Sequence, residues 1–356
     1  MNEELVLNVP LLRRRVPNLT VAARSVGLRS ATVSDLCTGK IPVGRAEVRT
    51  LSALASLAGC SIDELILRGG LAGFLETGIK ALDLLAPMVR GGTVGCVARS
   101  GVGQLVLLAE IMNRLREQRD FATILWLPSD GASVSLRLFA KGGDLTSAAE
   151  VTCETREEVA AAVVELGSRR DVLLVAHQET VLSGDLFQLR EAVDGPGNRP
   201  LTVALFGGES ALDEEAPFGP LDTLWRFDLD LFARGLFPAI DPIASTSVLT
   251  EGAQLEASHL TLATRARSLL RRYRDLRVIL KVRQADKLSA SDQNALRRGE
   301  RLEAFMSQPL YVAEEMTSRP GASASLAETL DGVRRILDGA ADQIAPEELK
   351  YIGPLV

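Results

Sequence analysis

A short glycine-rich turn around residue 102 has residue types that could do phosphate chemistry. The apolar run Val94–Ala98 predicts a strand and Gln104–Leu115 a helix, and between them stand Ser100, Gly101, Val102 and Gly103. A strand, a glycine turn and a helix form a phosphate loop, in which backbone N–H groups and the helix N-terminus bind an anion. Hydrolysis also needs a lysine and a hydroxyl residue at the start of the helix, where this chain has Gln104 and Leu105.

The start of the chain carries a second candidate surface, suited to nucleic acid. Residues 11–67 are predicted to form short helices, with Gly27 and Gly59 at helix ends and Ser30 as the N-cap of a helix over 31–36. Residues 1–70 hold nine Lys or Arg and six Asp or Glu, so they carry +3 and the remainder carries −9 of the net −6. A mildly basic module on an acidic body favours a nucleic-acid contact made by the N-terminal part alone.

The composition is that of a globular protein, with 46% hydrophobic and 24% charged residues among 356. This length is enough for two or three domains. No run reaches the roughly 18 to 20 apolar residues of a spanning helix, and residues 1–15 lack the apolar stretch of a signal peptide. We therefore expect a cytoplasmic protein without membrane insertion. The four cysteines are scattered, which predicts reduced thiols and no metal site.

The run from Leu19 to Lys40, with the later segment 61–65, resembles the Cro/repressor-type helix-turn-helix family. The resemblance implies that the second helix enters the major groove of DNA. The residues that it would place near bases are Arg29, Ser30, Ala31, Thr32 and Ser34, and those near phosphates are Thr20 and Lys40. The alternative is a helical bundle that binds protein instead. It is favoured by Asp35 on the recognition helix and by the single cation, Arg29, at the start of that helix that could pair with guanine.

Several longer motifs resemble the catalytic beta subunit of rotary ATP synthases. They are Glu76-Thr77-Gly78-Ile79-Lys80, Asp83 to Pro87, Gly91-Gly92, the glycine turn, Phe237 to Ser247, Asp286 to Ser289, Phe305 to Pro309, Val312 to Glu315 and Tyr351 to Pro354. The family's N-terminal barrel is absent. The two resemblances together imply an α/β fold class with an all-α helix-turn-helix module (1–68), a RecA-like P-loop α/β domain with a mostly parallel sheet (69–250) and a C-terminal helical domain (251–356).

At the positions where this family has its catalytic groups, the chain has other residues. Gln104 replaces the loop lysine, Leu105 the magnesium-binding hydroxyl, Ala98 the first loop glycine, Ser129-Asp130 the general-base glutamate, His177 the magnesium-bound aspartate and Val248 the arginine. Phosphoryl transfer needs charge neutralisation and a positioned water. We therefore expect no ATP hydrolysis, no metal and no catalytic residue.

Nucleotide binding without magnesium stays open as a separate question. The amides of the glycine turn, from Ser100 to Gln104, could still accept a phosphate. The resemblance matches Phe237 and Phe305 to rings of the adenine pocket, although aromatic residues are more often core. His177 is either a pH-sensitive group or a polar strand end without a role.

The rest of the chain is predicted to alternate strands and helices. Strands are expected near 94–98, 122–127, 149–153, 171–176 and 201–206, with helices near 104–118, 155–168 and 221–234. From about 251 the chain is expected to be helical. One of its helices is rich in arginine, which indicates either a basic patch or a solvated helix face.

Three hypotheses about function follow. The first is a DNA-binding regulator whose beta-like domain self-associates as a homo-oligomer or senses a ligand. The second is a scaffold, a ring or a filament, whose helix-turn-helix docks a protein partner. The third is a nucleotide-binding ATPase with unusual catalytic residues, against which the replaced loop positions argue.

Overall fold

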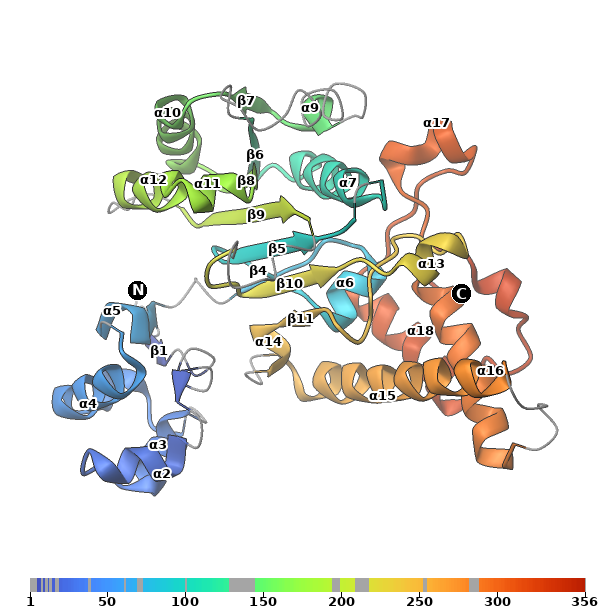
Figure 1. Ribbon diagram of the computed structural model, residues 1–356, viewed down its shortest axis with the longest axis horizontal. Helices are drawn as coiled ribbons and strands as arrows, with labels where there is room; N and C mark the ends of the chain where they lie inside the picture. Colours follow the sequence, from blue (N-terminus) through green and yellow to red (C-terminus); the bar gives the residue numbers. More distant parts are fainter. Residues whose placement is uncertain are drawn as a thin grey trace. The chain divides into compact units, whose positions relative to one another are not determined.

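The computed structural model describes residues 5–7, 9, 12, 15–16, 19–37, 40–60, 62–68, 73–99, 101–127, 145–193, 199–208, 218–251, 255–281 and 288–355. The chain divides into two compact units, Met1–Gly73 and Phe74–Val356. The helices of the C-terminal region therefore belong to the same compact unit as the large sheet (Figure 1).

The first unit is mostly helical. In chain order its elements are β1 (Leu5–Leu7), α2 (Leu19–Ser25), α3 (Ser30–Cys37), the 3-10 helix η1 (Val43–Arg45), α4 (Val48–Ala58), α5 (Ile62–Leu65) and β2 (Ile66–Arg68). The expectation of an all-α module is wrong in one respect, because β1 and β2 pair antiparallel, with Leu5 beside Arg68. Gly27 and Gly59 do end helices, with the left-handed φ values of 77° and 58° that favour glycine.

One apolar core holds the first unit together. Helix α4 has apolar residues at helical spacing, so that one face packs inward. The core side chains are Leu7, Val9, Leu12, Val16, Ala23, Val33, Leu36, Val43, Leu51, Leu54, Ala55, Ala58 and Leu65. Val33 and Leu36 therefore fix which face of α3 is turned away from the core.

A seven-stranded sheet forms the centre of the second unit in the described residues. Its strand order is β11-β10-β5-β9-β8-β6-β7, and every neighbouring pair is parallel except β10 with β11. The bounds are β5 Thr93–Val97, β6 Phe121–Trp126, β7 Val151–Cys153, β8 Asp171–His177, β9 Leu201–Gly207, β10 Thr223–Arg226 and β11 Thr246–Ser247. The predicted mostly parallel sheet is thus confirmed.

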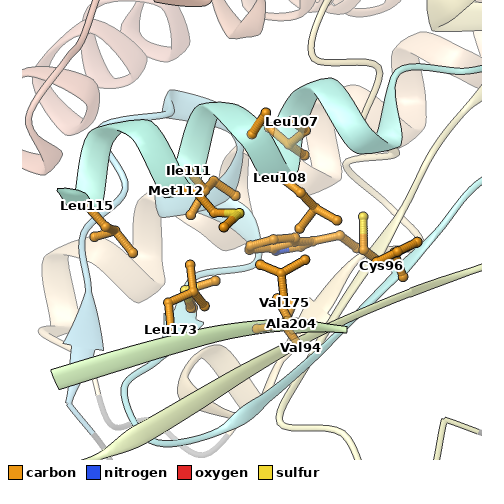
Figure 2. Close-up of a cluster of buried hydrophobic side chains, with 14 of the residues drawn as sticks. Val94, Cys96, Leu107, Leu108, Ile111, Met112, Leu115, Leu173, Val175 and Ala204 are labelled. Atoms are coloured by element: carbon orange, nitrogen blue, oxygen red, sulfur yellow. The ribbon is translucent and has the colours of Figure 1, made fainter. Parts of the chain in front are cut away.

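Helices cover both faces of this sheet, as near-continuous apolar strands require. On one face α7 (Gln104–Glu117) and α9 (Leu145–Ala148) pack against alternate strand residues such as Cys96 and Val175. Figure 2 shows the apolar side chains of α7 lying over those of the strands. On the other face α10 (Arg156–Gly167) and α12 (Asp185–Val193) meet the intervening residues, among them Leu174 and Leu205.

A third apolar cluster joins helix α6 (Lys80–Leu85) to the C-terminal helices. These are α15 (Ala257–Leu280), α16 (Ala290–Met306) and α18 (Leu326–Asp338), which contribute side chains such as Leu302 and Ile336. The smaller elements of this unit are β3 Phe74–Leu75, β4 Met88–Val89, α11 Glu179–Leu182, α13 Leu229–Ala233, α14 Val248–Glu251, η4 Tyr311–Ala313, α17 Glu314–Thr317 and η5 Pro346–Leu349.

The prediction of a helix over 221–234 is wrong. Its first half is strand β10, which pairs with β5 and places Trp225 beside Cys96. Thr223 and Trp225 are buried while Arg226 is exposed, so a β-branched and an aromatic residue two positions apart fill one face of a strand. Only the short helix α13 follows. The helices α11 and α12 were not expected.

The motif residues 77–83 tie the sheet to the C-terminal segments. Asp83 accepts hydrogen bonds from Thr77 N (3.0 Å), Thr77 Oγ1 (2.8 Å) and Gly78 N (2.7 Å), which fix the turn before α6. Gln308 donates from Nε2 to Gly78 O (2.8 Å) and accepts from Lys80 N (3.0 Å). The Gln308 side-chain amide thus joins segments more than 200 positions apart through hydrogen bonds.

Lys80 makes a second long-range contact, with the last residues of the described chain. Its Nζ donates to the carbonyl oxygens of Ile352 (2.7 Å) and Gly353 (3.2 Å) and lies 4.1 Å from the centroid of the Phe305 ring. Burial lowers the pKa of Lys80 to about 7. The lysine of the Glu-Thr-Gly-Ile-Lys motif is thus a buried structural group.

Candidate functional site

The glycine turn lies between β5 and α7 as predicted. Gly101 and Gly103 have φ values of 83° and 90°, so both use the left-handed region that glycine permits. Val102 is buried, and its N–H donates to Arg99 O at 3.3 Å. Helix α7 starts directly after Gly103 with no side-chain cap and no acidic residue in its first turn. The N-terminus of α7 therefore keeps the positive end of the helix dipole.

Gln104, the first residue of α7, turns its side chain back toward the sheet. Its Nε2 donates to Cys96 O on β5 and to Gly207 O at the end of β9 (3.0 Å). The half-buried amide thus joins two neighbouring strands at their carboxyl ends. The Gln104 side-chain amide therefore points at backbone acceptors, and because it is neutral it offers no charge to a phosphate.

The neighbouring positions are apolar. Leu105 is half-buried and packs against the core cluster of α7, and Ala98 is 3% exposed. Leucine offers no oxygen to a magnesium ion. The structure therefore places the two replaced loop positions, 104 and 105, in structural contacts.

His177 lies at the carboxyl end of β8, beside Phe206 of β9. Its ring meets the Phe206 ring edge to face, with centroids 5.2 Å apart, and Nδ1 lies 3.6 Å from a carboxylate oxygen of Glu179. Burial lowers the pKa of His177, and Glu179 opposes that effect. An imidazole that meets a core ring edge to face fits the interpretation of a polar strand end without a role.

Gln178 is a polar strand-end residue that the sequence reasoning missed. It is 7% exposed, its N–H donates to Phe206 O (3.0 Å), and its side chain covers Gly207, where a Cβ would meet Gln178 Oε1 at 1.8 Å. A side chain at position 207 would therefore require the Gln178 side chain to move away. A search for polar residues directly after each apolar strand would have found Gln178.

The remaining residues that the resemblance singled out make contacts within the protein interior or lie outside the described residues. Phe305 is fully buried between Lys80 and Gly332 in the helical region, where its ring is core. Phe237 is half-buried and packs edge to face on Phe232, with centroids 5.5 Å apart. Val248 is buried in a small apolar cluster with Val89. Ser100, Ser129 and Asp130 lie outside the described residues.

The outer face of α3 is the second candidate site. Ala31 and Ser34 are exposed, and Ser30 and Thr32 are half-buried, whereas Val33 and Leu36 face the core. Arg29 is exposed immediately before the helix. Ala31 and Ser34 therefore lie on the side of α3 that faces away from the core, and Ser30 and Thr32 lie at its borders. The side chain of Thr20 lies outside the described residues.

Two side-chain contacts shape this face. Arg24, in the last turn of α2, donates from Nε to Ser30 Oγ at 3.0 Å. Lys40 Nζ lies 3.8 Å from an Asp35 carboxylate oxygen, with the lysine side chain 74% exposed. The negative charge of Asp35, which favours the protein-docking alternative, thus has a lysine beside it.

The arginine-rich helix α15 makes contacts within the protein. Arg265 bonds to Asp338 (2.7 Å), Arg272 to Asp292 (2.6 Å), Arg274 to Asp228 and Asp241, and Arg277 to Asp230 (2.8 Å). Arg267 donates to the carbonyl oxygen of Leu85 at 2.8 Å. These arginines hold neighbouring elements in place, which argues against a free basic patch on α15.

Within the described ranges, no group of three or more His, Cys, Asp and Glu is placed to hold a metal ion. No helix in that part of the chain is long and apolar enough to cross a membrane.

No family model matches the chain. Among solved structures, it is similar to NeqB, described as a unique ATP synthase subunit from Nanoarcheaum equitans. The TM-score is 0.59 and the identity 18%, over 76% of this chain and 77% of that chain. At this identity the similarity shows the fold alone: the chain has an ATP-synthase-like fold.

Proposed function

We propose that this protein is a DNA-binding regulator, and that its ATP-synthase-like domain does not hydrolyse ATP and serves in self-association or ligand sensing. The outer face of α3 is the observation that carries the proposal. It combines small polar side chains with exposed Arg29 and Arg24 at the N-terminal end of the helix. A recognition helix reads base edges with its N-terminal residues, so cations and hydroxyls are useful there.

A selection from random duplexes with the full-length protein tests DNA binding. We expect one sequence to be enriched and to stay bound in moderate salt, because base contacts add to the salt-sensitive phosphate contacts. Arg29→Ala should weaken binding of that duplex, while Lys40→Ala should weaken all duplexes alike. If no duplex is enriched and binding vanishes in moderate salt, the regulator proposal is wrong.

The proposed lack of hydrolysis is supported by Gln104 and Leu105. The first gives its amide to two backbone carbonyls and the second packs in the core cluster, so neither position supplies a charge or a metal ligand. We expect no magnesium-dependent phosphate release above a mock preparation. The double variant Gln104→Lys with Leu105→Thr should remain inactive. It still has His177 at the position where the resemblance places a magnesium-binding aspartate. Steady release that a loop substitution abolishes would contradict this.

A second candidate function is a docking scaffold. Val21 on α2 and Val48 on α4 are 70% and 73% exposed, and exposed apolar residues suit a protein contact. A failed duplex selection would favour this candidate. In either case we expect a homo-oligomer in solution that forms through the ATP-synthase-like domain. For the regulator, a dimer would also match the paired half-sites that helix-turn-helix modules bind. A monomeric mass at micromolar concentration, with and without nucleotide, would contradict self-association.

A further inference from the structure

The turn between α2 and α3 is held by several local bonds. Gly27 N donates to Arg24 O (3.1 Å) and Leu28 N donates to Ala23 O (2.9 Å), the pattern that closes a helix C-terminus on a left-handed glycine. Arg24 stands in the last turn of α2, where the helix dipole favours a cation. The backbone on both sides of the turn is therefore fixed relative to Ser30.

Across this turn, Arg24 reaches the first residue of α3. Its Nε donates to Ser30 Oγ at 3.0 Å, and the residue as a whole is exposed. The guanidinium has five N–H groups in one plane, and this bond uses the one on Nε. Within the part of the chain that the structure describes, no hydrogen bond or ion pair engages the edge formed by Nη1 and Nη2, so that edge is available to a ligand.

That edge has a defined chemical preference. Its two parallel N–H donors match two acceptor atoms in one plane, as on the O6/N7 edge of guanine or on two phosphate oxygens. A guanidinium already held by Ser30 loses less side-chain freedom when it binds, which favours affinity. Among the described residues, other charges near α3 include Arg29, exposed at the same end, and the Lys40–Asp35 pair.

We propose that Arg24 is a DNA-contacting residue, held in place by Ser30, and that it acts with Arg29 as a pair of cations at the N-terminal end of α3. From the sequence, only Arg29 was expected at the N-terminal end of α3, because Arg24 belongs to the preceding helix. The inference rests on the proposed DNA binding and names a second contact residue within it.

The experiment measures binding of the full-length protein to the enriched duplex and to a scrambled duplex by fluorescence anisotropy at two salt concentrations. Arg24→Ala should weaken binding of the enriched duplex about tenfold or more. Arg24→Lys should lose most of that affinity, because an ammonium lacks the two-donor edge. Arg49→Ala, which removes an exposed cation paired with Glu47, is the matched control and should change binding by less than about twofold.

A double-mutant cycle tests the role of Ser30. Ser30→Ala should weaken binding in the wild-type background and have little further effect in the Arg24→Ala background, since the hydroxyl acts partly through the arginine. Thermal unfolding by circular dichroism checks that each variant is folded. A guanine contact predicts a loss confined to the enriched duplex, and a phosphate contact predicts equal losses on both duplexes with a salt slope reduced by about one.

Either pattern supports the inference. It is overturned if Arg24→Ala binds like the wild type while Arg29→Ala is weakened, or if Arg24→Lys binds like the wild type. In both cases the DNA-binding proposal survives. A wild-type protein that enriches no duplex overturns the DNA-binding proposal and this inference together.

Discussion

Replacing Gln104 by glutamate should destabilise the second unit at neutral pH. The substitution keeps the size and shape of the side chain and removes the donor that serves Cys96 O and Gly207 O. An acidic residue in the first turn of a helix normally stabilises it, by about 0.3–1 kcal/mol. The two effects have opposite signs, so Gln104→Glu distinguishes a side chain turned into the sheet from one that faces solvent.

The magnitude follows from the two bonds. A buried acceptor that loses its donor costs about 1–3 kcal/mol. Both carbonyls are at strand ends, and Gly207 O also accepts from Ala98 N at 3.4 Å, so the lower part of that range applies to each. After subtracting the helix-dipole benefit, we expect a loss of about 2 kcal/mol in the free energy of unfolding. The loss should shrink below about pH 5, because a protonated carboxyl can donate again.

Urea unfolding followed by tryptophan fluorescence measures this loss. The chain has two tryptophans, Trp126 and Trp225, and both are buried in the second unit, so the signal reports that unit. Gln118→Glu is the matched control, since Gln118 is exposed at the other end of α7. There the acid opposes the helix dipole, and the expected cost is below about 1 kcal/mol. A Gln104→Glu protein as stable as the wild type, or more stable, would refute the proposed contact with the sheet.

Two further predictions concern buried charges in the second unit. Lys80, whose pKa burial lowers from 10.5 to about 7, binds fewer protons when folded, so its contribution to the free energy of unfolding rises as the pH increases from about 7 to 10.5. Urea titrations should show this rise in the wild type and a flatter profile in Lys80→Met; equal profiles would contradict it. Glu110→Gln leaves Arg114 without its ion-pair partner at 2.6 Å and should cost about 3 kcal/mol in urea unfolding. Arg114→Met has a cost of its own, because Arg114 also donates to Gly78 O and Ala322 O at 2.8 Å, so the double variant should lose less than the sum of the two single losses; additive losses would contradict the pairing.

The central strands and long helices were predictable because their signals are local. Runs such as 171–177 are apolar throughout, which is what a strand buried on both faces needs. The helix ends at Gly27 and Gly59 follow from the left-handed φ that glycine adopts. Strand β10 was missed because a four-residue strand has little periodicity of its own, and its pairing with β5 joins segments about 130 positions apart.

The site was predictable only in part. Spacing alone placed Gln104 at the start of α7, but which way its amide turns depends on the carbonyl of Gly207, about 100 positions away. The face of α3 was predictable from the spacing of Val33 and Leu36. The bond from Arg24 to Ser30 was not, because it depends on how the turn folds α2 against α3.

The motifs that carry the resemblance separate into two physical classes in this structure. Thr77, Lys80, Asp83 and Gln308 hold other parts of the chain through hydrogen bonds in the interior, so the fold itself requires them. Gln104, at the start of α7, instead completes backbone contacts with Cys96 O and Gly207 O. Removing a buried hydrogen-bond partner destabilises a protein, whereas replacing a ligand-facing group need not. The interior bonds can therefore hold this fold whether or not the glycine turn binds a ligand.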